Sequence, residues 1–134
     1  MRTFDDLGKL VLRFTLGAIL LFHGIYKVQH GVAWIEQPLA ALGLPGFLAY
    51  GTYVAEVLGP LLLFLGYKAR LAALVIMLDM AMAMVLVLRP ALFTIKERGG
   101  GGWAVELEAF ILLSALTVFL LGSGRYRLGK GGWD

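Results

Sequence analysis

Long apolar runs alternate with short polar segments along the chain. Four runs stand out, at residues 7–28, 47–66, 71–88 and 104–121, and each contains 18 to 22 residues. A helix needs about 20 apolar residues to cross the hydrocarbon of a bilayer. Because backbone groups in lipid must be hydrogen-bonded within the protein, the runs are predicted to be helices. The pattern predicts an all-α fold, a transmembrane four-helix bundle.

The composition agrees with a membrane protein. Hydrophobic residues make up 60% of the chain and charged residues 16%, with a mean hydropathy of +0.82. Soluble domains have about 45–50% apolar and about 25% charged residues. The length fits one domain, so residues 1–134 are expected to form a single membrane domain. The sequence has no cysteine, which excludes disulfides, thiolate metal sites and thiol catalysis.

The first apolar run is expected to remain in the protein as a span. Two acids, Asp5 and Asp6, precede it, and no small-x-small cleavage site follows it. The run is also longer than the apolar core of a signal peptide.

The distribution of Lys and Arg predicts the orientation. With four spans, the amino terminus, the turn at 67–70 and the tail at 122–134 share one side, which carries six Lys and Arg against three on the other. The positive-inside rule then places both termini in the cytoplasm, in a multi-pass protein of the plasma membrane. The tail contains GRYRLGKG but lacks the Ser or Thr and the helix of a phosphate-binding loop. We therefore expect a basic cytoplasmic tail at the lipid surface, and no nucleic-acid binding.

The two loops of the opposite side differ from each other. Residues 29–46 contain Trp34, Ile35, Leu39 and Leu42 at helical spacing. This spacing predicts a short interfacial helix between the first two spans, with the tryptophan at headgroup level. Residues 89–103 include four consecutive glycines, which are typical of a flexible connection.

Ionisable residues inside the apolar runs are the main chemical signal. A lone charge at the centre of a bilayer costs about 2.5–3.5 kcal/mol on insertion scales. Several such residues could not all face lipid, so the bundle is predicted to have a polar interior. His23 and Lys27, four residues apart on one face, are expected to meet Glu106 and Glu108 near the outer surface.

Arg13 is expected at about the level of the two acids near mid-membrane, Glu56 and Asp79. The resulting hypothesis separates two groups of residues. The catalytic candidates are His23, Lys27 and Glu106, and the buried polar or ligand-binding candidates are Arg13, Glu56, Asp79 and Glu108. The same charges could instead serve only to fix helix register.

The second run carries signals for close packing and for an irregular helix. Gly51, Ala55 and Gly59 recur every four residues, a spacing that lets membrane helices approach closely. Pro60 is expected to kink the span just past Glu56 and to free a carbonyl. Two histidines and scattered carboxylates form no metal-ligand set, so no metal site is predicted.

Three stretches, at residues 10–28, 42–83 and 101–129, together resemble the DoxX family. The first has the sequence LVLRFTLGAILLFHGIYKV, with its Arg, Gly, His-Gly and Lys. The second carries a Gly-Leu-Pro turn, an Ala-Glu before Gly, and a Leu-Gly-x-x-x-Arg element. The third has a glycine-rich entry, a glutamate and a closing G-x-G-R.

The resemblance implies a small four-helix membrane protein of a family described as oxidoreductases. Some relatives resemble the membrane subunit of a thiosulfate:quinone oxidoreductase, and others are linked to complexes against oxidative or thiol stress. Two positions depart from the family pattern, because Pro60 replaces a small residue and Asp79 adds an acid. The matching polar positions are Arg13, His23, Lys27, Glu56, Arg70 and Glu106.

The expected function is that of a membrane subunit in a quinone-linked redox complex. A quinone, the candidate ligand, would enter between helices, with His23 exchanging a proton. Glu106 would orient the histidine, and Lys27 would stabilise the reduced oxygen. A partner protein would deliver the electrons.

Two alternatives stay open at this point. The protein could be a non-catalytic anchor or assembly scaffold. It could also be a small transporter or proton path that uses Glu56 and Asp79. Its apolar faces suit the lipid bilayer and are compatible with a homo-oligomer.

Overall fold

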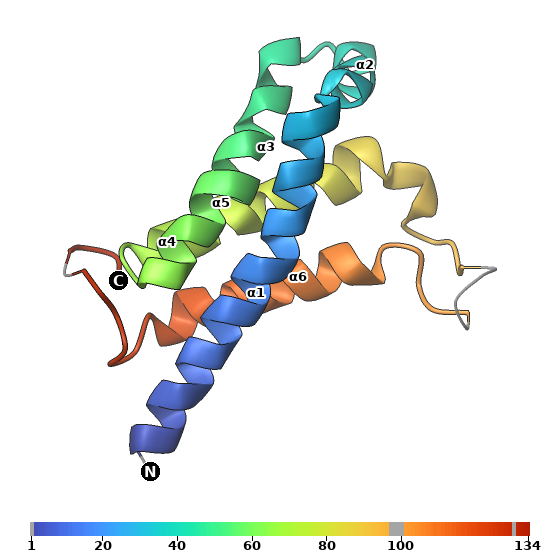
Figure 1. Cartoon of the computed structure of the whole chain (residues 1–134). Coiled ribbons are helices and arrows are strands. Elements are labelled where there is room, and N and C mark those ends of the chain that lie inside the picture. The colour runs from blue at the N-terminus through green and yellow to red at the C-terminus, as the bar shows by residue number, and fades with distance from the viewer. Residues whose placement is uncertain (1, 97–100, 130) are drawn as a thin grey trace.

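The computed structural model describes residues 2–96, 101–129 and 131–134, which are mainly helical (Figure 1). The first predicted span forms one long helix, α1 (Arg2–His30), and α2 (Ala33–Ala41) follows it. The later helical elements are, in order, η1 (Gly46–Tyr50), α3 (Gly51–Tyr53), η2 (Val54–Leu58), α4 (Gly59–Leu65), α5 (Ala69–Met82), η3 (Ala83–Val87), η4 (Arg89–Ala91) and α6 (Glu106–Leu121). The all-α prediction is confirmed.

Three of the four predicted spans are confirmed as helices that are long and apolar enough to cross a membrane. They cover Thr3–His30, Gly46–Leu65 and Ala69–Leu86. The fourth region is a helix of 16 residues, α6, which begins two residues later than expected. Its predicted first residue, Ala104, instead donates its N–H to the carbonyl of Thr94 at 2.9 Å. A bundle of four membrane-crossing helices therefore stays a prediction.

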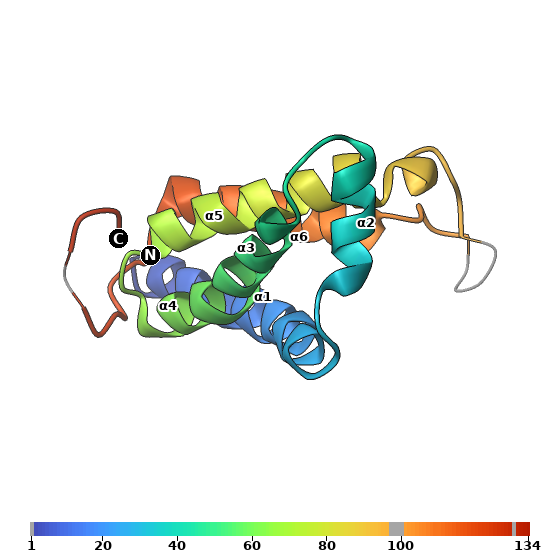
Figure 2. The same cartoon turned by 90° about the horizontal axis from the view of Figure 1, so that it is seen from above.

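The helices form two pairs that pack on each other. The most extensive contacts between elements are those of α5 with α6 and of α1 with α4. Figures 1 and 2 show the α5–α6 pair lying obliquely against α1 and α4. Small residues, Ala72 and Ala73 on α5 and Ala115 on α6, are buried in the apolar core. Leu16 and Leu20 of α1 complete the apolar core.

The short helix predicted between the first two spans is confirmed as α2. It crosses one end of the molecule, where it packs against η1 and η3 (Figure 2). Val32, Leu39 and Ala49 are buried there and form a second, smaller apolar cluster. Its position at a membrane interface stays a prediction.

The second spanning helix, Gly46–Leu65, is irregular just before Pro60, where the sequence predicted an irregularity. Residues 54–58 form a π-helix, in which the N–H of Gly59 bonds to the carbonyl of Val54, five residues back. Pro60 has no N–H, so the regular bond to the carbonyl of Glu56 cannot form. The wider turn lies directly before this missing bond. A second π-helix, η3, ends with the N–H of Leu88 bonded to the carbonyl of Ala83 at 2.8 Å.

Gly24 allows α1 to approach this irregular segment. A Cβ atom at position 24 would collide with the backbone carbonyl oxygen of Glu56 and would lie 2.7 Å from the carbonyl carbon. The predicted spacing of small residues on the second span contributes less. A Cβ at Gly59 would lie 3.3 Å from the Ile76 side chain, whereas a Cβ at Gly51 would meet nothing within 4 Å. The closest approach of the two helices thus depends on α1.

The tail at residues 122–134 folds against the turn between α4 and α5. The Asp134 carboxylate accepts the N–H of Lys68 at 2.8 Å and that of Gly131 at 2.8 Å. The N–H of Arg70 donates to the carbonyl of Trp133 at 2.8 Å. These bonds satisfy donors at the start of α5 that have no partner within the helix.

Replacing Gly24 with alanine should destabilise the protein by about 1–3 kcal/mol, because the new methyl group overlaps backbone that cannot move aside. Gly8→Ala is the matched control on the same helix, since nothing lies within 4 Å of its Cβ position. Unfolding of both variants in detergent micelles by denaturant titration measures the effect. Equal stability of the two variants would contradict the close approach.

Acid should weaken the attachment of the tail. The N–H groups of Gly131 and Lys68, helped by Arg127, hold the pKa of Asp134 below its ordinary value. Because the folded-state pKa is depressed, the stabilisation is complete above the unfolded-state pKa of about 3.9 and is lost as the pH falls through the folded-state value. Thermal unfolding as a function of pH should therefore show a smaller acid loss for Asp134→Asn than for the unchanged protein. Parallel pH profiles would rule out this role.

Candidate functional site

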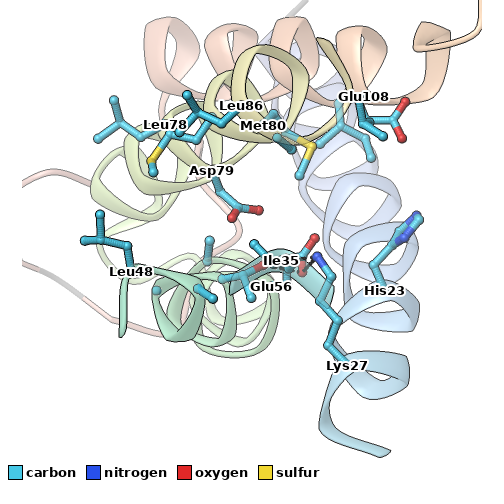
Figure 3. Close-up of a pocket in the computed structure, with 18 of the residues that line it drawn as sticks. His23, Lys27, Ile35, Leu48, Glu56, Leu78, Asp79, Met80, Leu86 and Glu108 are labelled. Carbon is cyan, nitrogen blue, oxygen red and sulfur yellow. Dashed lines mark hydrogen bonds and ion pairs between the residues drawn. The ribbon is translucent and has the colours of Figure 1, made fainter. Parts of the chain in front are cut away.

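A cavity of about 440 Å³ lies between α1, α2, the second spanning helix and α5. Its wall is mainly apolar, with Ile35, Leu39, Leu48, Leu78 and Leu86 among the lining residues (Figure 3). Both irregular segments contribute to it, since η2 supplies Ala55 and Glu56 and η3 supplies Ala83 and Leu86. Ligand pockets have about 300–1,000 Å³ and combine apolar walls with a few polar groups. The cavity meets both conditions.

An ion pair between α1 and η2 lies in the wall of this cavity. The ammonium of Lys27 contacts the carboxylate of Glu56, whose side chain is only 2% exposed. The Thr52 hydroxyl accepts from Lys27 at 3.1 Å and donates to Glu56 at 2.7 Å. Each of the three side chains therefore has a polar partner, as buried polar groups require.

Two aromatic residues hold Lys27 in place. The hydroxyl of Tyr53 donates to the backbone carbonyl of Lys27 at 3.1 Å, and the Trp34 ring centroid lies 5.9 Å from its ammonium. At this distance the cation interacts favourably with the face of the indole. The tryptophan expected at headgroup level thus lines the cavity.

Asp79 extends from α5 into the cavity, toward the second spanning helix (Figure 3). Its Oδ2 atom is buried and has no hydrogen-bond partner among the residues that the structure describes. Such an atom loses its interaction with water and gains nothing in return. The Asp79 side chain as a whole is part of the cavity lining.

His23 and Glu108 also line the cavity, from α1 and α6. Figure 3 shows both on the side of the cavity away from Asp79. His23 lies one turn before Lys27 on the same helix face. The cavity therefore brings together five of the seven predicted site residues, His23, Lys27, Glu56, Asp79 and Glu108.

The predicted contact of Lys27 and His23 with Glu106 is wrong. Glu106 begins α6 and is half exposed, with its Oε1 atom 3.3 Å from the ammonium of Lys96. The N–H of Lys96 bonds to the carbonyl of Gly102 at 2.7 Å, which places Lys96 near the start of α6. Glu106 does not line the cavity, and the acid that pairs with Lys27 is Glu56 of the second spanning helix.

The expected position of Arg13 beside the mid-membrane acids is also wrong. Its guanidinium is fully buried, donates to the carbonyl of Leu63 at 2.8 Å, and donates to the carbonyl of Tyr126. The last carbonyls of a helix lack partners within the helix and carry partial negative charge. Arg13 therefore joins the end of α4 to the tail and is no part of the cavity.

Sequence reasoning missed Thr52 and Tyr53 as site residues. Thr52 precedes Glu56 by four residues, a spacing that places both on one helix face. This spacing in the sequence could have identified Thr52 as a neighbour of Glu56. Among residues 2–96, 101–129 and 131–134, no group of three or more His, Cys, Asp or Glu could hold a metal ion.

Comparisons with known proteins give one family and one related protein. The DoxX family profile matches residues 8–89. The chain is 30% identical over 118 residues to the Bacillus subtilis (strain 168) protein named "Putative oxidoreductase CatD". The matched residues make up 88% of this chain and 81% of that protein. No solved structure matches the chain.

Removal of one partner from the buried pair should cost more than removal of both. Lys27→Met leaves Glu56 buried without its cation and should destabilise the protein by about 3–5 kcal/mol. The double variant Lys27→Met with Glu56→Gln should recover most of that loss, because no uncompensated charge remains. Denaturant titration of the single and double variants in micelles gives the coupling energy. A double variant no more stable than Lys27→Met alone would argue against the pair.

Proposed function

This chain belongs to the DoxX family, and we propose that it is a membrane subunit of a redox complex whose cavity binds the ring of a quinone. The observation that carries the proposal is the cavity itself. It is apolar over most of its wall, yet it contains the buried, unpartnered Oδ2 atom of Asp79. A quinone combines an apolar ring and tail with two oxygens, which matches this distribution.

The residues of the cavity have separate proposed roles. His23 exchanges protons with the quinone oxygen, since the ordinary pKa of an imidazole lies near neutrality. Asp79, in its protonated form, donates a hydrogen bond to the second oxygen of the quinone. The Lys27–Glu56 pair fixes α1 against the second spanning helix and thereby positions His23.

The reaction requires a partner. Reduction of a quinone consumes two electrons and two protons. A partner protein with a redox cofactor supplies the electrons and is itself oxidised, and the protons come from water through residues of the cavity. Within the proposal, residues 1–134 form one domain in the plasma membrane, with the α4–α5 turn and the tail in the cytoplasm.

A scaffold role is the second candidate, and one observation favours it. The charge of Lys27 is already compensated by Glu56 and Thr52 without any ligand. A charge pair that is already compensated can have the single role of fixing helix register, without any role in a reaction. Assembly of the partner complex distinguishes the two functions. A scaffold retains its partner but binds no quinone in the purified state.

His23→Ala should lower partner-driven quinone reduction by about a hundredfold, the usual contribution of a positioned acid–base group. His30→Ala is the matched control, because His30 is exposed, lies outside the cavity and stacks on Tyr26. The assay follows quinol formation in nanodiscs that contain the protein, its partner and a short-chain quinone. Equal rates for the two variants would remove His23 from the reaction.

Quinone binding itself can be measured without the partner. Trp34 lines the cavity, so a bound quinone should quench its fluorescence. Asp79→Leu should weaken binding by about tenfold through loss of a polar contact. Unchanged fluorescence at millimolar quinone would leave the scaffold role as the better explanation.

A further inference from the structure

A second hollow, of about 430 Å³, lies at the opposite end of the molecule from α2. It is formed where α1 and α5 begin, where α6 ends, and by the tail. Its lining is mostly polar and includes three cations, Lys9 on α1, Arg70 on α5 and Arg127 on the tail. These three side chains neither line the quinone cavity nor belong to the apolar core.

Cationic side chains outnumber acidic ones in this basic hollow. Among its described lining residues, Asp134 has the single acidic side chain, against three cations. The Asp134 carboxylate already accepts two backbone N–H groups and lies 3.6 Å from the Arg127 guanidinium. The side chains of Lys9 and Arg70 make no hydrogen bond or ion pair within the described part of the chain.

Two glycines shape the basic hollow around these cations. Gly122 and Gly124 both have positive φ angles, of 80° and 79°, where a side chain would be strained. A Cβ atom at position 122 would lie 3.1 Å from the Arg70 guanidinium, and one at position 124 would lie 3.0 Å from Cδ of Lys9. The tail can therefore pass beside both cations without covering them.

An exposed apolar side chain also lines the basic hollow. It belongs to Leu121 at the end of α6 and is 46% exposed, and Leu71, the residue after Arg70 on α5, is 39% exposed. Cations beside an exposed apolar surface at the end of membrane helices match the chemistry of a phospholipid, whose phosphate lies next to its acyl chains.

We propose that the basic hollow binds the phosphate of an anionic phospholipid headgroup, with Arg70 and Lys9 as its direct contacts. Arg70 contributes a planar fork of donors that matches phosphate geometry, and Lys9 adds a point charge. The acyl chains lie along Leu71 and Leu121. This site is independent of the quinone cavity and of the proposed redox function.

The test measures lipid binding to the full chain in neutral detergent. Phosphatidylglycerol is added in one arm, phosphatidylcholine in a second and inorganic phosphate in a third, with native mass spectrometry and thermal unfolding as readouts. Phosphatidylglycerol should remain bound and raise the unfolding temperature, and the other two should not. Arg70→Gln and Lys9→Gln should each weaken its binding by about fivefold.

Arg125→Gln is the matched control, because it removes a cation from the same tail outside the basic hollow. It should leave phosphatidylglycerol binding unchanged. An equal loss with Arg125→Gln and Arg70→Gln would show diffuse surface attraction and overturn the proposal. Binding of inorganic phosphate as tight as that of the lipid would overturn it as well. Unfolding without lipid identifies a variant that fails to fold, and the other variant then carries the test.

Discussion

The fold depends on the energetic cost of placing charges in an apolar layer. Lys27 and Glu56 lie on two helices that are both long and apolar enough to cross a membrane. Either charge alone would be unfavourable there. Together, and with Thr52, they form a closed set of polar contacts that also determines which faces of the two helices meet. The glycine at position 24 lets the backbones approach, so the two side chains can reach each other.

The cost of burying the Arg13 cation is offset by backbone carbonyls instead of an acidic side chain. Its guanidinium has five N–H donors, and carbonyls at a helix end can accept some of them. The end of α4 and the tail provide two such carbonyls. One buried cation thus stabilises the wall of the cavity, whereas the other holds the chain together at the end where the tail folds back.

The sequence was sufficient for the features that depend on local pattern. Three spanning helices, the short helix α2 and the irregularity before Pro60 follow from apolar length, helical spacing and a missing N–H. The level of a residue within a span predicted that Glu56 and Asp79 would share an interior space. The same reasoning did not predict the pairing of Lys27, because it put Lys27 near the outer surface and Glu56 near mid-membrane, whereas the two side chains meet. Glu106 was misassigned because the sequence does not show that Gly102 and Ala104 bond to Lys96 and Thr94 instead of extending α6.

The π-helix at residues 54–58 has a consequence for the length of the second spanning helix. A wider turn accommodates one residue more than a regular turn, and each residue of an α-helix advances the chain by about 100° around the axis. If residues 54–58 were instead wound as regular α-helix with no residue removed, Thr52 and everything before it would be rotated by about 100° relative to α4. The π-helix takes up the surplus residue within one turn and so keeps the two halves of this helix in their observed alignment.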